Sequence, residues 1–305
     1  MQSIIEPTDL CTARLVVSGR FIRTASIWDE DWVEEELASH PEVLIRALRN
    51  NRHADIFAFS PALLHNHRPY HYPHLVENHA VVRLSSFNDW WEGLPQESRK
   101  NVRRSQRRGI ATSIAPFDSA LVNGITAIYN ELPVRQGRRF KHYGKTLAAA
   151  EAENQSYLDR SIFLAAYLGS ELVGFVKLVI VNSVGRIMQI LSLERHVDKR
   201  PTNALIAKAV EVCCERKLKY LIYGRYVYGN KEHSPMTEFK RRNGFEQLNY
   251  PRYFAPVTST GSLAIRCGLH LGFSRLLPEG VMTFLLHARA GFYARKFGTS
   301  SQEAV

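Results

Sequence analysis

The stretch covering residues 185–245 constrains the fold most, because it reads as an unbroken series of strand, helix, strand and helix. The first strand is predicted at residues 186–193, where apolar side chains follow Gly185 and end at a run of charged residues. Pro201 opens the next helix, since proline fixes φ and tolerates the first helical turn. This order of elements favours an α/β fold.

A buried helix is predicted at residues 204–217. Its apolar side chains recur at the three-and-four spacing of one helical face: Leu205, Ile206, Ala209, Val210 and Cys213. A strand at residues 220–223 and a loop rich in Tyr and Gly follow. A short helix at residues 236–242 then ends at Asn243-Gly244-Phe245, where the glycine supplies the left-handed residue with which many helices end.

The N-terminus of the helix at residues 204–217 is a candidate anion site. Thr202 and Asn203 can cap backbone donors there, and the unpaired N–H groups at a helix start carry partial positive charge. The basic residues that add full charges are Arg195, Lys199 and Arg200. Two interpretations stay open: a seat for phosphate or pyrophosphate, and an ordinary capped helix with solvated basic neighbours.

The series of elements, with Phe239-Lys240 followed by Asn243-Gly244-Phe245, resembles the Gcn5-related N-acetyltransferase (GNAT) superfamily, especially the branch similar to the FemAB peptidoglycan aminoacyltransferases. A basic helix that stops at Gly109 and a strand pair at residues 163–178 also resemble that branch. The whole chain is similar to uncharacterised bacterial GNAT-family proteins. One difference is that the superfamily's glycine-rich pyrophosphate loop corresponds here to residues 199–204, which contain no glycine.

The resemblance implies an acyl-CoA N-acyltransferase fold of the α/β class, in which helices flank a mixed, mostly antiparallel central sheet. Three parts are expected: a small N-terminal α/β portion at residues 1–79, the GNAT-like domain at residues 80–258 and an amphipathic helical tail at residues 259–305. Similar proteins carry a degenerate half-copy of the fold in the first part. Residues 279–297 show an apolar stripe with basic flanks, which favours packing on the protein itself or on a partner, with an anionic membrane surface as the alternative.

The chain of 305 residues carries 40 Lys and Arg against 29 Asp and Glu, which gives a formal net charge of +11. Such an excess favours polyanionic partners, which include the phosphates of CoA, nucleotide-linked sugars, tRNA and an anionic membrane. The cysteines at positions 11, 213, 214 and 267 lack the paired spacing of a metal site, and this favours a reduced setting. Since neither a secretory signal pattern nor an apolar run near the roughly 20 residues of a spanning helix is found, we expect a cytoplasmic protein, with a peripheral position at the inner membrane face as the alternative.

The N-terminal portion reads as a strand at residues 13–25, an acidic helix at residues 29–38, a helix at residues 41–50 and a strand at residues 55–60. A proline-rich loop then contains five histidines, namely His65, His67, His71, His74 and His79. No cysteine accompanies them, and a loop does not place two ligands on one helical face. We therefore expect no metal and a surface loop stiffened by prolines.

A strongly basic helix is predicted at residues 96–108. Its basic residues, with no acidic residue between the first and the last, are Arg99, Lys100, Arg103, Arg104, Arg107 and Arg108. Either this helix binds a polyanion by neutralising phosphates, or its charges form a solvated face. A strand at residues 110–115 and a helix at residues 118–131 follow.

The loop at residues 133–144 is dense in arginine and aromatic side chains. Such loops suit planar anionic or carbohydrate-like ligands, through bidentate hydrogen bonds and stacking. The candidate substrate-binding residues are Arg135, Arg138, Arg139, His142 and Tyr143, and a mobile basic surface loop is the alternative.

After a helix at residues 146–156, three strands form a meander: residues 163–168, 172–181 and 185–193. Lys177 lies within the second strand and is expected at the edge of the sheet, with its amine in water.

Acyl transfer to an amine needs a base, a stabiliser of the tetrahedral oxyanion and a proton donor. Glu194 and His196 follow the first strand of the 185–245 stretch and are the base candidates, although each can instead pair with a basic neighbour. Tyr223 and Tyr228 follow the next strand and are candidate proton donors, although aromatic packing is the commoner role. The resemblance implies that Lys240 stabilises charge at the reacting carbonyl. It also implies a donor site made of Leu191, Leu193, Lys199, Arg200, Thr202, Asn203 and Ala204.

The predicted function is that of an N-acyltransferase that moves an acyl group from acyl-CoA, acetyl-CoA or a longer ester, to an amine of the acceptor. A FemAB-like transferase that uses aminoacyl-tRNA is the alternative, to which the basic helix, Lys240 and the missing glycines point. A non-enzymatic protein that binds nucleic acid or a membrane surface is a further alternative. It would account for the charge without an active site.

Overall fold

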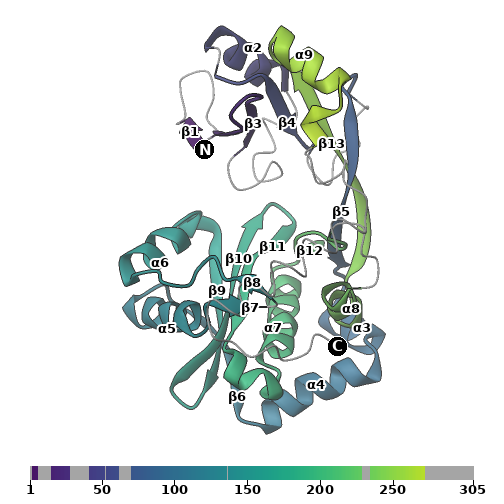
Figure 1. Cartoon of the computed structure of the whole chain (residues 1–305). Helices are drawn as coiled ribbons and strands as arrows, with labels where there is room; N and C mark the ends of the chain where they lie inside the picture. Colours follow the sequence, from purple (N-terminus) through teal and green to yellow (C-terminus); the bar gives the residue numbers. More distant parts are fainter. Residues whose placement is uncertain are drawn as a thin grey trace. The chain divides into compact units, whose positions relative to one another are not determined.

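The computed structural model describes residues 2–5, 15–27, 41–51, 53–61, 70–135, 137–228 and 234–271. The chain forms two compact units (Figure 1). The described part of the first unit comes from the chain up to Asn78 and from Asn249 onward, and the second unit is His79–Leu248. Strands β5 (His74–Arg83) and β13 (Glu246–Pro256) each contain residues of both units. The predicted helices at residues 29–38 and 279–297 lie outside the described residues.

The second unit is built on a mixed sheet in the order β5-β12-β11-β10-β9-β6. Its other strands are β6 (Ile110–Ala115), β9 (Ser161–Leu168), β10 (Glu171–Val181), β11 (Val184–Ser192) and β12 (Tyr220–Ile222). Neighbouring strands are antiparallel except β11 and β12, which are parallel because helix α7 (Pro201–Glu215) connects them. The predicted mixed, mostly antiparallel sheet flanked by helices is therefore confirmed.

Helices cover both faces of this sheet (Figure 1). On one face lie α5 (Ser119–Asn130) and α6 (Leu147–Asn154), and on the other lies α7. Helices α3 (Phe87–Gly93) and α4 (Gln96–Arg107) pack against α7. Gly174 of β10 faces α7 closely, since a Cβ there would lie 3.0 Å from a methyl carbon of Leu205. The apolar periodicity of α7 thus buries this helix against the sheet.

Strands β11 and β12 diverge, and this divergence positions the site described below. They pair only over Val184–Arg186 and Tyr220–Ile222, while β11 continues to Ser192. Within the described residues, no strand pairs with the second half of β11 on that side. The pairing of β10 with β11 also shifts by one residue at Met188, which forms a bulge. The backbone groups of this half of β11 that face β12 are therefore outside the strand ladder.

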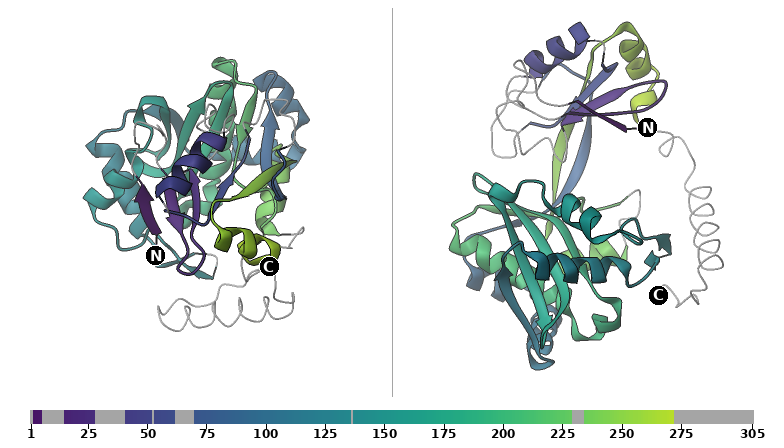
Figure 2. Two further views of the ribbon diagram at one scale, coloured as in Figure 1. Left: turned by 90° about the horizontal axis from the view of Figure 1, so that it is seen from above. Right: turned by 90° about the vertical axis from the view of Figure 1, so that its left-hand side faces the viewer.

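The first unit has the strand order β1-β2-β3-β4-β13. Its other strands are β1 (Gln2–Ile5), β2 (Leu15–Ser18), β3 (Thr24–Ile27) and β4 (Ile56–Phe59). Helix α2 (Pro41–Asn51) lies on one face of the sheet and α9 (Ser259–Arg266) on the other (Figure 2). Successive side chains of β4 contribute to the apolar clusters on opposite faces of the sheet. Phe57 and Phe59 pack with α2, whereas Ile56 and Ala58 pack with α9.

Three expectations about local structure are wrong. Strand β5 begins at His74, so His74 and His79 lie in a strand and not in the expected proline-rich loop. The single strand expected at residues 13–25 is a hairpin, because Gly19 takes a φ of +102° and turns the chain between β2 and β3. Lys177 does not lie at a sheet edge: β10 runs between β9 and β11, and the side chain is 3% exposed. Its ammonium donates to the carbonyl of Asn154 at 2.9 Å and to Oγ of Ser156 at 2.7 Å, so the charge is solvated by the protein.

Candidate active site

Lys240 lies at the centre of the strongest candidate site. It comes from helix α8 (Pro235–Arg242), and its side chain is fully buried. The ammonium donates to the carbonyl of Arg225 and to the hydroxyl of Tyr228 at 3.5 Å. It also lies 4.5 Å from the ring centre of Tyr223 and 4.7 Å from that of Tyr228. The structure therefore brings together three of the five predicted catalytic residues.

Burial changes the acidity of all three groups. Loss of water lowers the pKa of Lys240 to about 8, because the charged form is less stable away from solvent. Burial likewise raises the pKa of the Tyr223 and Tyr228 hydroxyls, so both stay protonated near neutral pH. The faces of the two aromatic rings partly offset the desolvation of the ammonium. The result is a cation held in a low-dielectric setting next to the end of β12.

The Asn-Gly-Phe sequence after α8 fixes this helix against its neighbours. The side chain of Asn243 accepts from Nδ2 of Asn203 at 3.1 Å and donates to the carbonyl of Phe239 at 2.7 Å, and its own carbonyl accepts from the indole of Trp90 at 3.2 Å. Gly244 has a φ of +81°, and a Cβ there would lie 2.7 Å from the indole nitrogen of Trp90. Only glycine fits this position. The buried amide of Asn203 is thus used in holding α8.

Glu194 and His196, the predicted bases, lie in the turn η3 (Glu194–Lys199) directly after β11. The Glu194 carboxylate is 45% exposed and lies 3.9 Å from the guanidinium of Arg135. Nε2 of His196 lies 3.0 Å from the Glu171 carboxylate. Within the described residues, neither forms a hydrogen bond or ion pair with Lys240. Both side chains lie at the end of β11, where Glu194 faces Arg135 and His196 faces Glu171.

A buried clamp between Glu131 and Arg135 holds the end of β11, and the sequence did not reveal it. The Glu131 carboxylate accepts from the backbone N–H of Glu194 at 2.7 Å and of Arg195 at 3.1 Å. Arg135 donates to the carbonyls of Ser192 at 2.9 Å and Ile128 at 2.8 Å. Arg135 was expected to contact substrate, and the structure shows it binding backbone carbonyls of its own unit.

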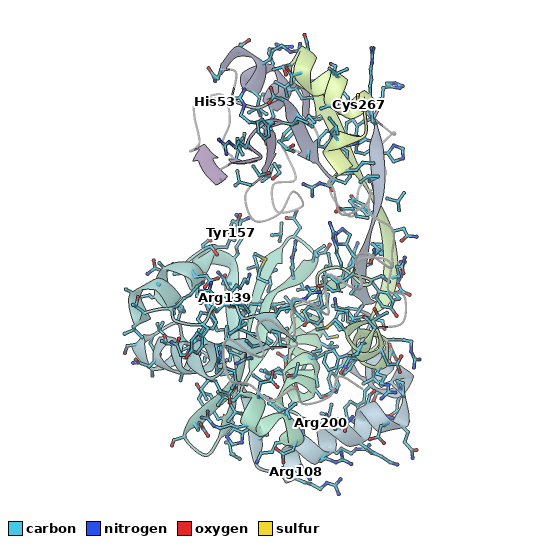
Figure 3. The ribbon with its side chains drawn as sticks, viewed as in Figure 1. His53, Arg108, Arg139, Tyr157, Arg200 and Cys267 are labelled. Atoms are coloured by element: carbon cyan, nitrogen blue, oxygen red, sulfur yellow. The ribbon has the colours of Figure 1, made fainter. Side chains whose placement is uncertain are left out.

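The other predicted substrate residues fall into two groups. Arg138, Arg139 and Tyr143 are exposed, with both arginines in β8 (Arg138–Arg139), which pairs with β7 (Val134–Arg135); Figure 3 labels Arg139. His142 is only 3% exposed. The three exposed side chains are available to a ligand, whereas His142 is part of the protein interior.

His142 belongs to a buried polar network that sequence reasoning missed. Its Nδ1 lies 3.0 Å from the Glu153 carboxylate and its Nε2 lies 3.3 Å from Nε2 of Gln189. The Gln189 side chain also accepts from the hydroxyl of Tyr129 at 2.8 Å. Burial alone raises the pKa of Glu153, but hydrogen bonds from His142 and Lys145 lower it to about 2. The network holds α5, α6 and β11 together next to the bulge at Met188.

The N-terminus of α7, the expected pyrophosphate seat, offers few free donors. Pro201 has no N–H, and the N–H groups of Asn203 and Ala204 both donate to the carbonyl of Arg200, at 3.1 and 3.4 Å. This leaves the N–H of Thr202 as the donor of the first turn that no described group takes up. Of the other residues expected there, Leu193 and Ala204 are buried, Leu191 and Lys199 are partly buried, and Arg200 is exposed. A helix start usually provides three or four such donors.

Helix α4 presents an unbalanced basic stripe near this terminus. Its buried face, Ser98, Val102 and Ser105, packs toward α7. Arg99 pairs with Glu92, and Arg108 pairs with Asp198 at 3.0 Å, close to Arg200 (Figure 3). In the part of the chain that is described, no acidic side chain pairs with the remaining four basic residues, Lys100, Arg103, Arg104 and Arg107. We call these four residues the α4 stripe.

No group of three or more His, Cys, Asp or Glu side chains that could hold a metal is found in the described ranges. His65 and His67 lie outside those ranges, and His74 packs against the ring of Tyr253 at 5.4 Å. Cys213, Cys214 and Cys267 are free thiols. Among the described helices, none has the length and apolar character needed to cross a membrane.

Comparisons by sequence give no match to any protein-family model or to any curated protein. By structure, the chain is similar to the C-terminal domain of a putative lysylphosphatidylglycerol synthetase from Agrobacterium fabrum, with 14% identity, 87% of each chain covered and a TM-score of 0.57. It is also similar to L-PGS from Bacillus licheniformis, with 13% identity, 90% of this chain and 88% of that chain covered and a TM-score of 0.56.

FemX is a further structural neighbour, with 10% identity, 83% of this chain and 85% of that chain covered and a TM-score of 0.55. Several GNAT proteins also match, including a tandem GNAT protein from the clavulanic acid biosynthesis pathway. The chain therefore has a FemX-like α/β fold, as the resemblance to the FemAB branch predicts.

Proposed function

We propose that this protein is a transferase that moves an acyl or aminoacyl group from an activated carbonyl donor to an amine. The observation that carries the proposal is the buried ammonium of Lys240, held between Tyr223 and Tyr228 where β12 leaves β11. Structural neighbours named for lysyl transfer to phosphatidylglycerol, together with FemX and GNAT proteins, support a transferase of this general class.

The proposed chemistry follows from the need to stabilise charge. When an amine attacks an ester or thioester carbonyl, negative charge develops on the carbonyl oxygen. A desolvated ammonium acts on such an oxyanion more strongly than a hydrated one, because the local dielectric constant is low. Lys240 has this role in our proposal, and the hydroxyl of Tyr228, a residue that is 50% exposed, is the group through which a proton reaches the leaving group.

Glu194 is the proposed route for the proton of the attacking ammonium. Its carboxylate is exposed at the end of β11, while the backbone under it is fixed by Glu131. His196 is less suited to direct contact with the attacking amine, because its Nε2 faces Glu171 and its side chain is only 15% exposed. A base at this position acts directly or through water.

An acyl-CoA donor is the first form of the proposal, as expected for an N-acyltransferase of the GNAT type. The pyrophosphate of such a donor would use the Thr202 N–H together with Lys199 and Arg200. An aminoacyl-tRNA donor is the second form. Two specific observations favour it: Pro201 removes a donor from the α7 N-terminus, and the α4 stripe presents several cations without acidic partners.

The two forms differ in a direct assay. Purified protein is incubated with acetyl-CoA, a long-chain acyl-CoA or charged tRNA, and both thermal stabilisation and group transfer to added amines are measured. Transfer that ribonuclease abolishes identifies the tRNA form, and transfer that survives ribonuclease and requires a CoA ester identifies the first form. Absence of binding to any of these donors would contradict the transferase proposal and favour a non-enzymatic role.

A further inference from the structure

The β2–β3 hairpin of the first unit ends in an exposed aromatic residue. Phe21 is 87% exposed, and the guanidinium carbon of Arg20 lies 5.8 Å from its ring centre. The turn depends on Gly19, since a Cβ there would lie 2.0 Å from the carbonyl oxygen of Ile22. No acidic residue occurs in the described segment 15–27. The tip is therefore a fixed turn that presents an aromatic ring beside a positive charge.

Helix α9 and the turn η4 (Leu269–Leu271) present side chains of the same kind. Leu263 is 62% exposed and Leu269 is 44% exposed, while Ala264 is buried against the sheet. Arg266 is exposed between the two leucines, and segment 259–271 contains no acidic residue. The exposed side chains of α9 and η4 thus include two leucines and an arginine beside Ser259 and Thr260, without a carboxylate.

One carboxylate joins these two segments into a single surface. Asp55 accepts from the backbone N–H of Arg23 at 2.9 Å, at the base of the hairpin, and from the hydroxyl of Thr258 at 3.0 Å, at the N-cap of α9. Ile22 of the hairpin and Ile265 of α9 also pack on the same apolar cluster. We call the exposed residues of both segments the hairpin–α9 surface: Arg20, Phe21, Leu263, Arg266 and Leu269.

We propose that the hairpin–α9 surface lies on an anionic lipid bilayer. Its exposed apolar side chains suit the boundary between headgroups and acyl chains, and its arginines suit anionic headgroups. The chain that leaves this surface after Leu271 contains, at residues 279–297, an apolar stripe with basic flanks in its sequence. Stable attachment to a membrane takes two such signals, and the chain offers both in succession. This inference goes beyond the proposed transferase activity and shares no residue with the site around Lys240.

The test uses the full-length protein and sedimentation with vesicles. We expect binding to vesicles of phosphatidylcholine mixed with phosphatidylglycerol, weaker binding to phosphatidylcholine alone, and loss of the difference at high salt. Replacing Phe21→Ser and Leu263→Ser together should weaken binding to the anionic vesicles at least about tenfold, because two exposed apolar groups no longer enter the bilayer. Replacing Arg20→Gln and Arg266→Gln should reduce the preference for phosphatidylglycerol.

Val43→Ser is the matched control, because Val43 is 49% exposed on α2, which covers the other face of the same sheet. It should leave vesicle binding unchanged. Thermal melting of each variant checks that the fold is retained. The proposal is overturned if the wild-type protein ignores anionic vesicles. It is also overturned if the folded Phe21→Ser/Leu263→Ser variant binds them as tightly as wild type, which would assign binding to another part of the chain.

Discussion

Replacing Lys240→Met is the most informative perturbation, because it removes a buried charge while keeping an unbranched side chain of similar size. Burial lowers the pKa of this ammonium from its ordinary 10.5 to about 8. The difference of about 2.5 units corresponds to roughly 3 kcal/mol by which the folded state disfavours the charged form near pH 7. Methionine does not carry this cost. The lost hydrogen bonds and ring contacts offset part of the gain.

The expected stability of the variant follows with a definite sign. The folded-state pKa lies below the unfolded value, so the unfolded chain binds more protons, and wild-type stability rises as the pH rises from about 8 to about 10.5. Lys240→Met lacks this dependence. We therefore expect the variant to melt at or above the wild-type temperature at pH 7, and we expect its advantage to shrink toward pH 10.

Turnover by the Lys240→Met variant should fall, although its thermal stability should not. Loss of one oxyanion-stabilising group typically lowers kcat by roughly 10²–10³-fold, or about 3–4 kcal/mol. The assay measures kcat and KM for the donor that proves active, beside circular dichroism of the same preparations. The control is Lys219→Met, since Lys219 is an exposed lysine just before β12. A well-folded Lys240→Met protein with wild-type kcat would refute the catalytic role, and a variant that does not fold would show that Lys240 is structural.

Three further predictions follow. Activity should fall as the pH rises through about 8, because Lys240 must be protonated to stabilise an oxyanion; a rate that instead rises there would indicate a neutral amine acting as base. Replacing Lys100, Arg103 and Arg107 by Gln should weaken tRNA binding and lower the slope of log affinity against log salt concentration by about 2–3. Arg99→Gln serves as the control, because Arg99 already pairs with Glu92. Unchanged binding would exclude the α4 stripe as the RNA contact. Gly244→Ala should destabilise the fold by about 1–3 kcal/mol in denaturant titrations. Gly93→Ala is the control and should leave stability unchanged, because a Cβ there meets nothing within 4 Å. Equal stability of the two variants would contradict the packing described at Trp90.

The elements of the second unit follow closely from the sequence. Apolar periodicity predicts the helix that became α7, and the Asn-Gly-Phe sequence predicts where α8 ends. These patterns are local, since each is set by residues within a few positions of one another. Lys240 could be singled out for the same reason, because it lies within a short sequence signature. The proposal for its chemistry rests on its surroundings, which the signature does not contain.

The hairpin at Gly19 and the position of Lys177 show where local patterns fail. An apolar segment around a glycine reads as one strand or as two, and only the pairing of β2 with β3 decides. A lysine inside an apolar strand is exposed at an edge or buried at the centre of a sheet. The strand order, with β10 between β9 and β11, placed Lys177 at the centre, where carbonyl groups replace water.

The sequence by itself determined most of the described helices and strands of the second unit and the buried face of α7, because hydrophobic periodicity is a property of neighbouring residues. Only the tertiary structure decided which polar groups meet. Glu131 binds the N–H of Glu194 from 63 positions away, and Tyr129 donates to Gln189 from 60 positions away. Such partners have no fixed spacing in the chain, since the fold alone brings them within hydrogen-bond distance. The same holds for Asp55, which joins the hairpin to α9 through Thr258.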